Sequence, residues 1–345
     1  MKFRLARKLR LRPSMLTMFV LLTLPVFAAM VIVNYVSNER IARANAYELA
    51  ERFRVEAIAN IQNVFAPIKS MVASAAAVGR EQPEFYSDNR AMRYLFGITS
   101  HSDTITSAYV GLEDASFRQV RRIDPAVKIQ DKPPPPGSRF AYRWIEAAKK
   151  PPVIDRYRFL DTGEKELGQS EEATRYDPRQ RPWYRAAVAE GRPMVSDPDV
   201  FAALGLVGFT IAAPIYRNGN LIGVAAADIT LDVLSEYLSK RKISPGSLSY
   251  VLDHQGRVIA NSERSKTYTD VNGKVELQHI TSVGGKLTTI AFGSHETQGE
   301  KLYTFEHADK QYVAGLSTPP PEFGKKWQLF VITPLEDFTQ AFDQQ

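Results

Sequence analysis

The densest group of residues that could hold a small ligand lies between Tyr176 and Arg185, where the chain reads Tyr-Asp-Pro-Arg-Gln-Arg-Pro-Trp-Tyr-Arg. Arginine offers a two-pronged fork to a carboxylate. Trp183 and Tyr184 supply apolar walls, each with one hydrogen-bonding group. The run therefore predicts a pocket for a small anion. A second interpretation stays open, in which both aromatic residues begin a helix as core residues and the arginines are solvated or pair with Asp177.

Asp228 is the other candidate, because it ends a run that is typical of a strand. Ile222, Val224 and Ala226 share its face by the two-residue period of a strand. An acid on an apolar face needs a partner, such as a ligand ammonium or an internal arginine. Its alternative role is turn or cap chemistry, although Thr230 is better placed to cap a following helix.

No catalytic or metal-binding motif is found in the sequence. The sequence lacks Gly-x-Ser-x-Gly, a phosphate-binding Gly-Lys-Ser/Thr loop, Gly-x-Gly-x-x-Gly and His-Glu-x-x-His. There is no cysteine, which excludes thiolate catalysis, iron-sulfur clusters and disulfides. We therefore expect no catalytic residue, no metal site and no cofactor in these residues. An intact parent protein could still carry an output domain such as a nucleotide cyclase.

The charge distribution argues against nucleic acid as a partner. The 345 residues contain 44 Lys plus Arg against 38 Asp plus Glu, a net charge of +6. The first twelve residues hold Lys2, Arg4, Arg7, Lys8, Arg10 and Arg12 and no acid. The remainder is formally neutral, whereas a nucleic-acid binder needs a basic surface on its folded part.

The N-terminal region predicts a membrane anchor. Residues 13–38 contain no Asp, Glu, Lys, Arg or His, and about 20 apolar residues cross a bilayer. We expect a transmembrane helix at 13–36 after a cytoplasmic basic tail at 1–12, oriented by the positive-inside rule. A cleaved signal peptide is the alternative, but its apolar region is usually about 7–15 residues. The chain would then lie at the inner membrane with a single span, and its bulk would be periplasmic.

The rest of the chain predicts an α+β fold with a stalk helix and two serial modules. Apolar residues recur at helical spacing over 37–80. A distal module follows at 81–243, with a hairpin that turns at Asn218-Gly219 and a helix from 231 to about 242. A proximal module at 244–335 contains predicted strands, one of them at 286–292. Residues 336–345 begin a helix that we expect to lead to a missing second transmembrane segment.

Three segments of the sequence resemble the double Cache sensor domains of bacterial receptors. They are Tyr176-x-x-x-x-Arg181-x-Trp183-Tyr184, Ala226-Ala-Asp228-Ile229 and Tyr250-Val-Leu-Asp-x-x-Gly256. The resemblance covers 37 to about 342 and implies two tandem PAS-like modules with antiparallel sheets. The run Tyr109–Asp114 is in addition similar to the sensor halves of membrane-bound adenylate and guanylate cyclases. Chemoreceptors carry sensors of the same kind.

The resemblance also implies where a ligand binds. In these sensors the membrane-distal module is generally the binding module. In the amino-acid-binding branch, the residues matching Arg181, Trp183 and Tyr184 hold the ligand carboxylate. The acid matching Asp228 holds the ligand amino group.

One part of that branch pattern differs in this sequence. A tyrosine and an aspartate, two positions apart, are replaced by Asp199 and Phe201. The ligand class therefore stays open among amines, amino-acid-like compounds, small carboxylates and purine-like compounds. The expected ligand-binding residues are Arg181, Trp183, Tyr184, Asp228, Asp199, Phe201 and Tyr176.

We therefore expect the extracytoplasmic sensor of a transmembrane receptor. Ligand capture would displace a helix and carry the signal across the membrane. The partners would be a small molecule, the membrane and a second copy joined through the stalk helices, with no nucleic acid. The alternatives are a membrane-anchored periplasmic enzyme and an interaction protein without a small-molecule ligand.

Overall fold

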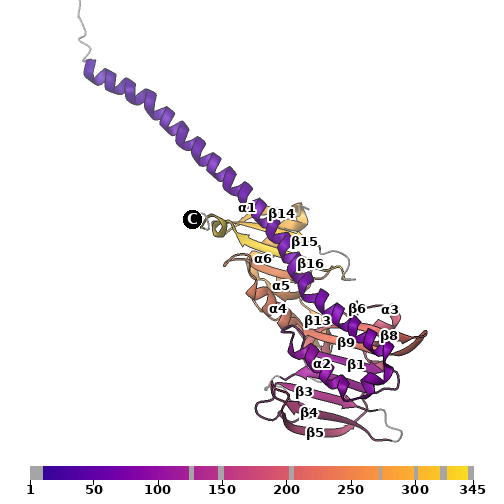
Figure 1. Cartoon of the computed structure of the whole chain (residues 1–345). Helices are drawn as coiled ribbons and strands as arrows, with labels where there is room; N and C mark the ends of the chain where they lie inside the picture. The colour runs from indigo at the N-terminus through magenta and orange to yellow at the C-terminus, as the bar shows by residue number, and fades with distance from the viewer. Residues whose placement is uncertain are drawn as a thin grey trace, which may run out of the picture.

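The computed structural model describes residues 11–123, 128–146, 151–201, 206–271, 274–298, 302–318 and 325–340. Over these residues the chain is α+β and its paired strands are antiparallel, as the sequence predicted (Figure 1). Most of the expected basic tail and the end of the expected C-terminal helix lie outside the described residues.

The helices are dominated by α1 (Leu11–Glu81), which is 71 residues long and continues through Pro25 and Pro67. The others are η1 (Pro83–Ser87), α2 (Arg90–Ser100), η2 (Pro178–Gln180), α3 (Pro182–Glu190), α4 (Leu231–Lys240), α5 (Ile280–Val283), α6 (Gly285–Gln298) and α7 (Leu335–Gln340).

The distal sheet has nine strands in the order β5-β4-β3-β2-β1-β9-β8-β6, and β7 also pairs with β8. The strands are β1 (Ser107–Leu112), β2 (Phe117–Arg122), β3 (Phe140–Ile145), β4 (Val153–Leu160), β5 (Glu166–Thr174), β6 (Met194–Val195), β7 (Asp199–Phe201), β8 (Leu206–Arg217) and β9 (Asn220–Thr230). The central β1 and β9 are far apart in the sequence.

The proximal sheet has five strands in the order β11-β10-β16-β15-β14, and β12 and β13 form a separate hairpin. The strands are β10 (Leu248–Leu252), β11 (Val258–Asn261), β12 (Tyr268–Val271), β13 (Lys274–Leu277), β14 (Leu302–His307), β15 (Lys310–Ser317) and β16 (Gln328–Pro334). Both sheets lie along the C-terminal half of α1, and the five-stranded sheet is closer to the N-terminal half of that helix (Figure 1).

The predicted hairpin and the helix after it are confirmed. The β8–β9 turn has φ angles of 51° at Asn218 and 80° at Gly219, the positive values that a two-residue hairpin turn requires. Thr230 caps α4, because its hydroxyl accepts a hydrogen bond from Val233 N at 3.3 Å. The hairpin thus ends directly at a capped helix, which fixes the end of β9 beside Asp228.

The prediction of a strand at 286–292 is wrong, because this segment belongs to α6. Thr288 and Ala291 are fully buried in the proximal core. Tyr303 Oη donates to the Ala291 carbonyl at 2.6 Å, and Tyr250 Oη lies 3.1 Å from Thr288 Oγ1. The two threonines and the isoleucine favour a strand locally, but helical packing on the sheet places the buried positions on one side.

The main core runs through both modules along α1. Phe65 on this helix packs edge-on against Phe209 of β8 at 6.5 Å and against Trp327 at 5.1 Å between ring centroids. Phe209 and Trp327 are themselves 4.9 Å apart. Ring clusters of this kind stabilise beyond the area they bury, so α1, the distal sheet and the start of β16 share one hydrophobic core.

In the part of the chain that the structure describes, no helix has the length and apolar character needed to cross a membrane. The structure therefore does not support the expected span at 13–36. On α1, large apolar side chains from Met18 to Val36 are exposed, with exposed fractions from 39% for Val36 to 73% for Leu21.

Candidate functional site

The two faces of the distal sheet differ in chemistry. One face packs on α1 and α2 and is apolar, with Val110, Val120 and Ile211 fully buried. On the opposite face, strand register aligns polar residues from neighbouring strands in two rows. The first row is Thr210, Asp228, Ser107 and Arg121, and the second is Ala226, Tyr109, Gln119 and Arg143.

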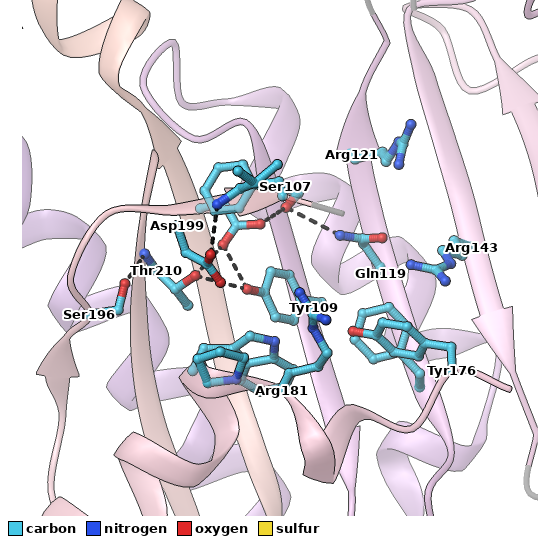
Figure 2. Close-up of a pocket in the computed structure, with 16 residues that line it drawn as sticks. Ser107, Tyr109, Gln119, Arg121, Arg143, Tyr176, Arg181, Ser196, Asp199 and Thr210 are labelled. Carbon is cyan, nitrogen blue, oxygen red and sulfur yellow. Dashed lines mark hydrogen bonds between the residues drawn. The ribbon is translucent and has the colours of Figure 1, made fainter. Parts of the chain in front are cut away.

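A cavity of about 60 Å³ lies over these rows, large enough for a few water molecules or the polar end of a small molecule. Figure 2 shows its lining side chains. The lining residues are Ser107, Tyr109, Phe117, Gln119, Arg121, Arg143, Tyr176, Arg181, Pro182, Trp183, Ser196, Asp199, Val200, Phe201, Thr210 and Asp228.

All the residues expected at the site line this cavity except Tyr184. The Tyr184 hydroxyl donates instead to Glu113 Oε2 at 2.9 Å, and its ring is buried in the small core under α3. Tyr184 is thus a structural residue of α3, whereas Trp183 beside it faces the cavity.

Arg181 and Trp183 are positioned by the short turn before α3. Asp177 caps η2, since its carboxylate accepts a hydrogen bond from Arg179 N at 3.0 Å. Arg179 Nη1 then donates to the Glu113 carbonyl at 2.9 Å and ties the turn to the end of β1. Pro182 begins α3 with a φ suited to a first turn. Among the described residues, the Arg181 guanidinium has no ion-pair or hydrogen-bond partner.

Gly111 on β1 allows this turn to lie directly on the sheet. A Cβ at this position would be 2.7 Å from Pro178 Cβ and 3.0 Å from Trp183 Cη2. Such a contact is too short for any side chain. Glycine is therefore required because Pro178 and Trp183 approach the β1 backbone closely, and not because the position has a positive φ. The Trp183 ring can therefore pack edge-on against Tyr109, with centroids 4.9 Å apart.

Asp228 is the acidic centre of the cavity. It is 5% exposed, and its carboxylate accepts hydrogen bonds from three hydroxyl groups: Tyr109 Oη at 2.6 Å, Ser107 Oγ at 2.8 Å and Thr210 Oγ1 at 2.8 Å. Burial raises the pKa of Asp228 to about 6, although these hydrogen bonds oppose the shift. The positive charge of Arg121 also opposes the shift, so the site holds a buried anion among hydroxyl donors with a buried arginine in its surroundings.

The opposite side of the cavity is cationic. Arg121 is 1% exposed, and burial lowers its pKa to about 10, so it stays protonated at neutral pH. Arg143 is also buried and pairs with Asp155 through two nitrogens, the shorter contact being 2.7 Å. The Arg143 guanidinium also lies over the Tyr176 ring at 4.5 Å, a cation-π contact that places Tyr176 at the wall.

The remaining wall is the segment from Ser196 to Phe201. Ser196 Oγ accepts from Thr210 N at 2.9 Å, and Asp199 Oδ1 accepts from Val200 N at 2.8 Å. The segment also meets the proximal module, because Asp197 pairs with Lys325 at 2.6 Å and β7 contacts β13. One wall of the cavity is therefore held by both modules.

The sequence did not single out several of the residues that build the cavity. These are Ser107, Tyr109, Gln119, Arg121, Arg143, Ser196 and Thr210. One signal was available in β2, where Gln119 and Arg121 follow Phe117 at the two-residue spacing of a single strand face. Among the described residues, no group of three or more His, Asp or Glu side chains could hold a metal ion.

Sequence comparison identifies the family and its relatives. The profile of the Cache domain family matches residues 38–342. Adenylate cyclase 1 of Rhizobium meliloti (strain 1021) is 33% identical over 195 residues, which cover 56% of this chain and 29% of that protein. The methyl-accepting chemotaxis protein McpA of Pseudomonas putida (strain KT2440) is 40% identical over 93 residues, covering 26% of this chain and 14% of McpA.

Structure comparison agrees on the fold. The ligand-binding domain of the Pseudomonas fluorescens chemoreceptor CtaA, in complex with L-alanine, matches with a TM-score of 0.50 at 15% identity and covers 85% of this chain and 98% of that domain. The sensory domain of the Campylobacter jejuni chemoreceptor Tlp3 also gives 0.50, at 12% identity, with 85% and 97% covered. The chain thus matches nearly whole sensor domains but less than a third of either sequence relative.

Proposed function

Since the chain belongs to the Cache domain family, as the match over residues 38–342 establishes, we propose that its distal cavity captures a small molecule. The ligand is an amine, an amino-acid-like compound or a carboxylate. The family membership makes the matched residues a sensor domain and not an enzyme. The cavity in the distal sheet is where this chain offers both charges that such ligands need.

The observation that carries the proposal is the environment of Asp228. Its buried carboxylate accepts hydrogen bonds from three hydroxyl donors, yet burial raises its pKa more than these bonds and the charge of Arg121 lower it. An ionised carboxylate in such a place costs free energy unless a positive charge joins it. A ligand ammonium would supply that charge. At the other end, the Arg181 guanidinium is available to a ligand carboxylate.

The solved CtaA complexes support an amino-acid-like ligand. That domain binds L-alanine, L-isoleucine and L-leucine. At 15–16% identity the likeness carries the fold alone, and Asp199 and Phe201 depart from the pattern of the amino-acid-binding branch. Simple amines and small carboxylates therefore belong to the proposed ligand range.

We further propose that ligand capture signals across a membrane through α1. The relatives are an adenylate cyclase and methyl-accepting chemotaxis proteins. In support, residues 13–38 are free of charge, and the apolar side chains of α1 between Met18 and Val33 are exposed around the helix. Helices that are apolar on all sides are stable in lipid or in a partner. This topology places both modules in the periplasm and lets two α1 helices associate.

A thermal-shift screen tests ligand capture. The full chain in detergent is heated with amino acids, amines, organic acids and purines. A ligand at 100 times its Kd adds about 2.7 kcal/mol of stability. The proposal expects a stabilising compound for the wild type that fails to stabilise Asp228→Asn. The matched control is Asp103→Asn, because Asp103 is exposed and does not line the cavity, and this variant retains the shift.

A library that stabilises neither the wild type nor the control contradicts the proposed function. The same holds for an amine or amino acid that stabilises Asp228→Asn as well as the wild type. The membrane topology has its own measurement. A reporter enzyme that is active only in the periplasm, fused after Gln345, gains activity if the proposed orientation holds and stays inactive if the modules are cytoplasmic.

A further inference from the structure

Gln119 on β2 has an unused hydrogen-bond acceptor beside the cavity. The side chain lines the cavity and is 8% exposed. Its amide nitrogen Nε2 donates to Ser107 Oγ at 3.3 Å. Its amide oxygen Oε1 is buried and has no hydrogen-bond partner among the described residues. A buried acceptor without a donor is uncommon and costs stability.

The orientation of this amide is determined by the neighbouring protons. Ser107 has a single hydroxyl proton, which it donates to Asp228 Oδ2 at 2.8 Å. Ser107 Oγ can therefore only accept from Gln119. Turning the amide around would place two acceptors, Gln119 Oε1 and Ser107 Oγ, against each other. The ionised Asp228 carboxylate thus fixes which end of the Gln119 amide is left without a partner.

The unpartnered oxygen lies in the second polar row, between positions occupied by Tyr109 and Arg143 on the adjacent strands. Arg121 follows two residues later on the same face and also lines the cavity. A ligand group that reaches Gln119 therefore meets an acceptor next to a buried cation. An ammonium group would be repelled by Arg121, and a carboxylate would face the amide oxygen with no proton to donate.

We propose that Gln119 is a specificity-determining residue that selects ligands carrying a neutral hydroxyl or amide N–H in addition to the charged group bound at Asp228 or Arg181. This inference rests on the proposed function and narrows its ligand class. Such a group donates to Gln119 Oε1 and can accept from Arg121. An isosteric methyl group leaves the Gln119 acceptor buried and unsatisfied, and it is rejected by about tenfold or more.

Matched pairs of compounds test the inference by isothermal titration calorimetry on the full chain in detergent. Each pair exchanges a hydroxyl for a methyl group: ethanolamine with propylamine, L-serine with L-2-aminobutyrate, and glycolate with propionate. In the pair that binds, we expect the hydroxyl compound to bind the wild type about tenfold more tightly. Gln119→Met keeps the side-chain length and removes the acceptor, so it brings the ratio close to one.

Two further variants separate a recognition role from a structural one. Thr106→Val removes another buried and unpartnered oxygen, Thr106 Oγ1, which lies outside the cavity lining, and it retains the wild-type ratio. Gln119→Leu removes the same acceptor with a different apolar side chain and also brings the ratio close to one. The second variant keeps the inference open to test even if Gln119→Met does not fold.

Equal affinities for the two members of a binding pair in the wild type overturn the inference and leave the proposed function intact. An unchanged ratio in Gln119→Met has the same meaning. If none of the six compounds binds and no compound of the wider thermal-shift library stabilises the wild type, the proposed function itself fails. If a library compound binds but no member of the three pairs binds, only the inference fails.

Discussion

Tyr109 Oη donates a hydrogen bond of 2.6 Å to Asp228 Oδ1, although the two residues are separated by 119 positions in the chain. Strand register places Asp228 opposite Ser107, so the phenol of Tyr109 reaches the carboxylate diagonally across the β1–β9 pair. The same ring packs edge-on against Trp183 at the start of α3. Tyr109 therefore joins the acidic centre of the cavity to the helix beside Arg181.

Tyr109→Phe is expected to shift the pH dependence of ligand binding. In the wild type an ammonium ligand requires ionised Asp228, so its affinity falls about tenfold per pH unit below about 6. The variant keeps the ring but loses the hydroxyl whose hydrogen bond lowers the pKa of Asp228, and the midpoint moves to higher pH. Calorimetric titration between pH 5 and 8 checks this. A midpoint that stays in place would mean that Tyr109 does not affect the carboxyl.

Asp228→Asn is expected to raise stability at neutral pH. The folded-state pKa of about 6 lies above the ordinary 3.8, so between these values the folded state binds more protons than the unfolded state. Stability therefore falls as pH rises through this window, by on the order of 3 kcal/mol from this group, and stays lower above pH 6. Urea unfolding of both proteins from pH 3.5 to 8 isolates the effect as a difference. A variant that is less stable than the wild type at pH 7 would contradict it.

Asp155→Asn is expected to destabilise the distal sheet strongly. Asp155 and Arg143 form an ion pair at 2.7 Å with side chains only 6% and 7% exposed, and removing one partner leaves a buried charge uncompensated. Such changes cost about 3–5 kcal/mol. Glu48→Gln is the control, because its pair with Arg52 is on the surface and contributes little. Equal unfolding free energies for the two variants would contradict this prediction.

Gly111→Ala is expected to weaken ligand binding as well as the fold. The new methyl group would overlap Pro178 and press on Trp183, which displaces the turn that carries Arg181. We expect a loss of about 1–3 kcal/mol in stability and of about tenfold in affinity. Gly97→Ala in α2, where no atom lies within 4 Å of the new Cβ, stabilises by up to about 1 kcal/mol. Thermal unfolding and titration of both variants provide the comparison.

Local sequence patterns were sufficient to predict the elements that depend only on neighbouring residues. Asn218-Gly219 predicts its turn because both positions need positive φ, and Thr230 predicts a helix start through its hydroxyl. The segment 286–292 shows where such patterns are insufficient. Its β-branched residues favour a strand, and only the proximal sheet, formed by strands remote in sequence, determines that α6 is a helix.

The residues of the candidate site also differ in whether local sequence patterns predict them. Arg181 and Trp183 belong to one short run and Asp228 to an apolar strand, so their chemistry was visible locally. Gln119 and Arg121 resemble ordinary strand residues until β2 is placed beside β1 and β9. Pairing of strands more than a hundred residues apart is not encoded in any local period, and it alone builds the polar rows. The resemblance to double Cache sensors predicted Tyr184 in the site, but its hydroxyl donates a hydrogen bond to Glu113 instead.

The ion pair between Asp197 and Lys325 gives the cavity wall a second attachment. Asp197 precedes the lining residue Asp199 by two positions, whereas Lys325 leads into the proximal sheet. A ligand that draws this wall inward must work against that attachment, and thermodynamic linkage makes the effect reciprocal. Lys325→Met, at a residue that does not line the cavity, should therefore change ligand affinity, and ligand binding should change the strength of the ion pair by the same free energy.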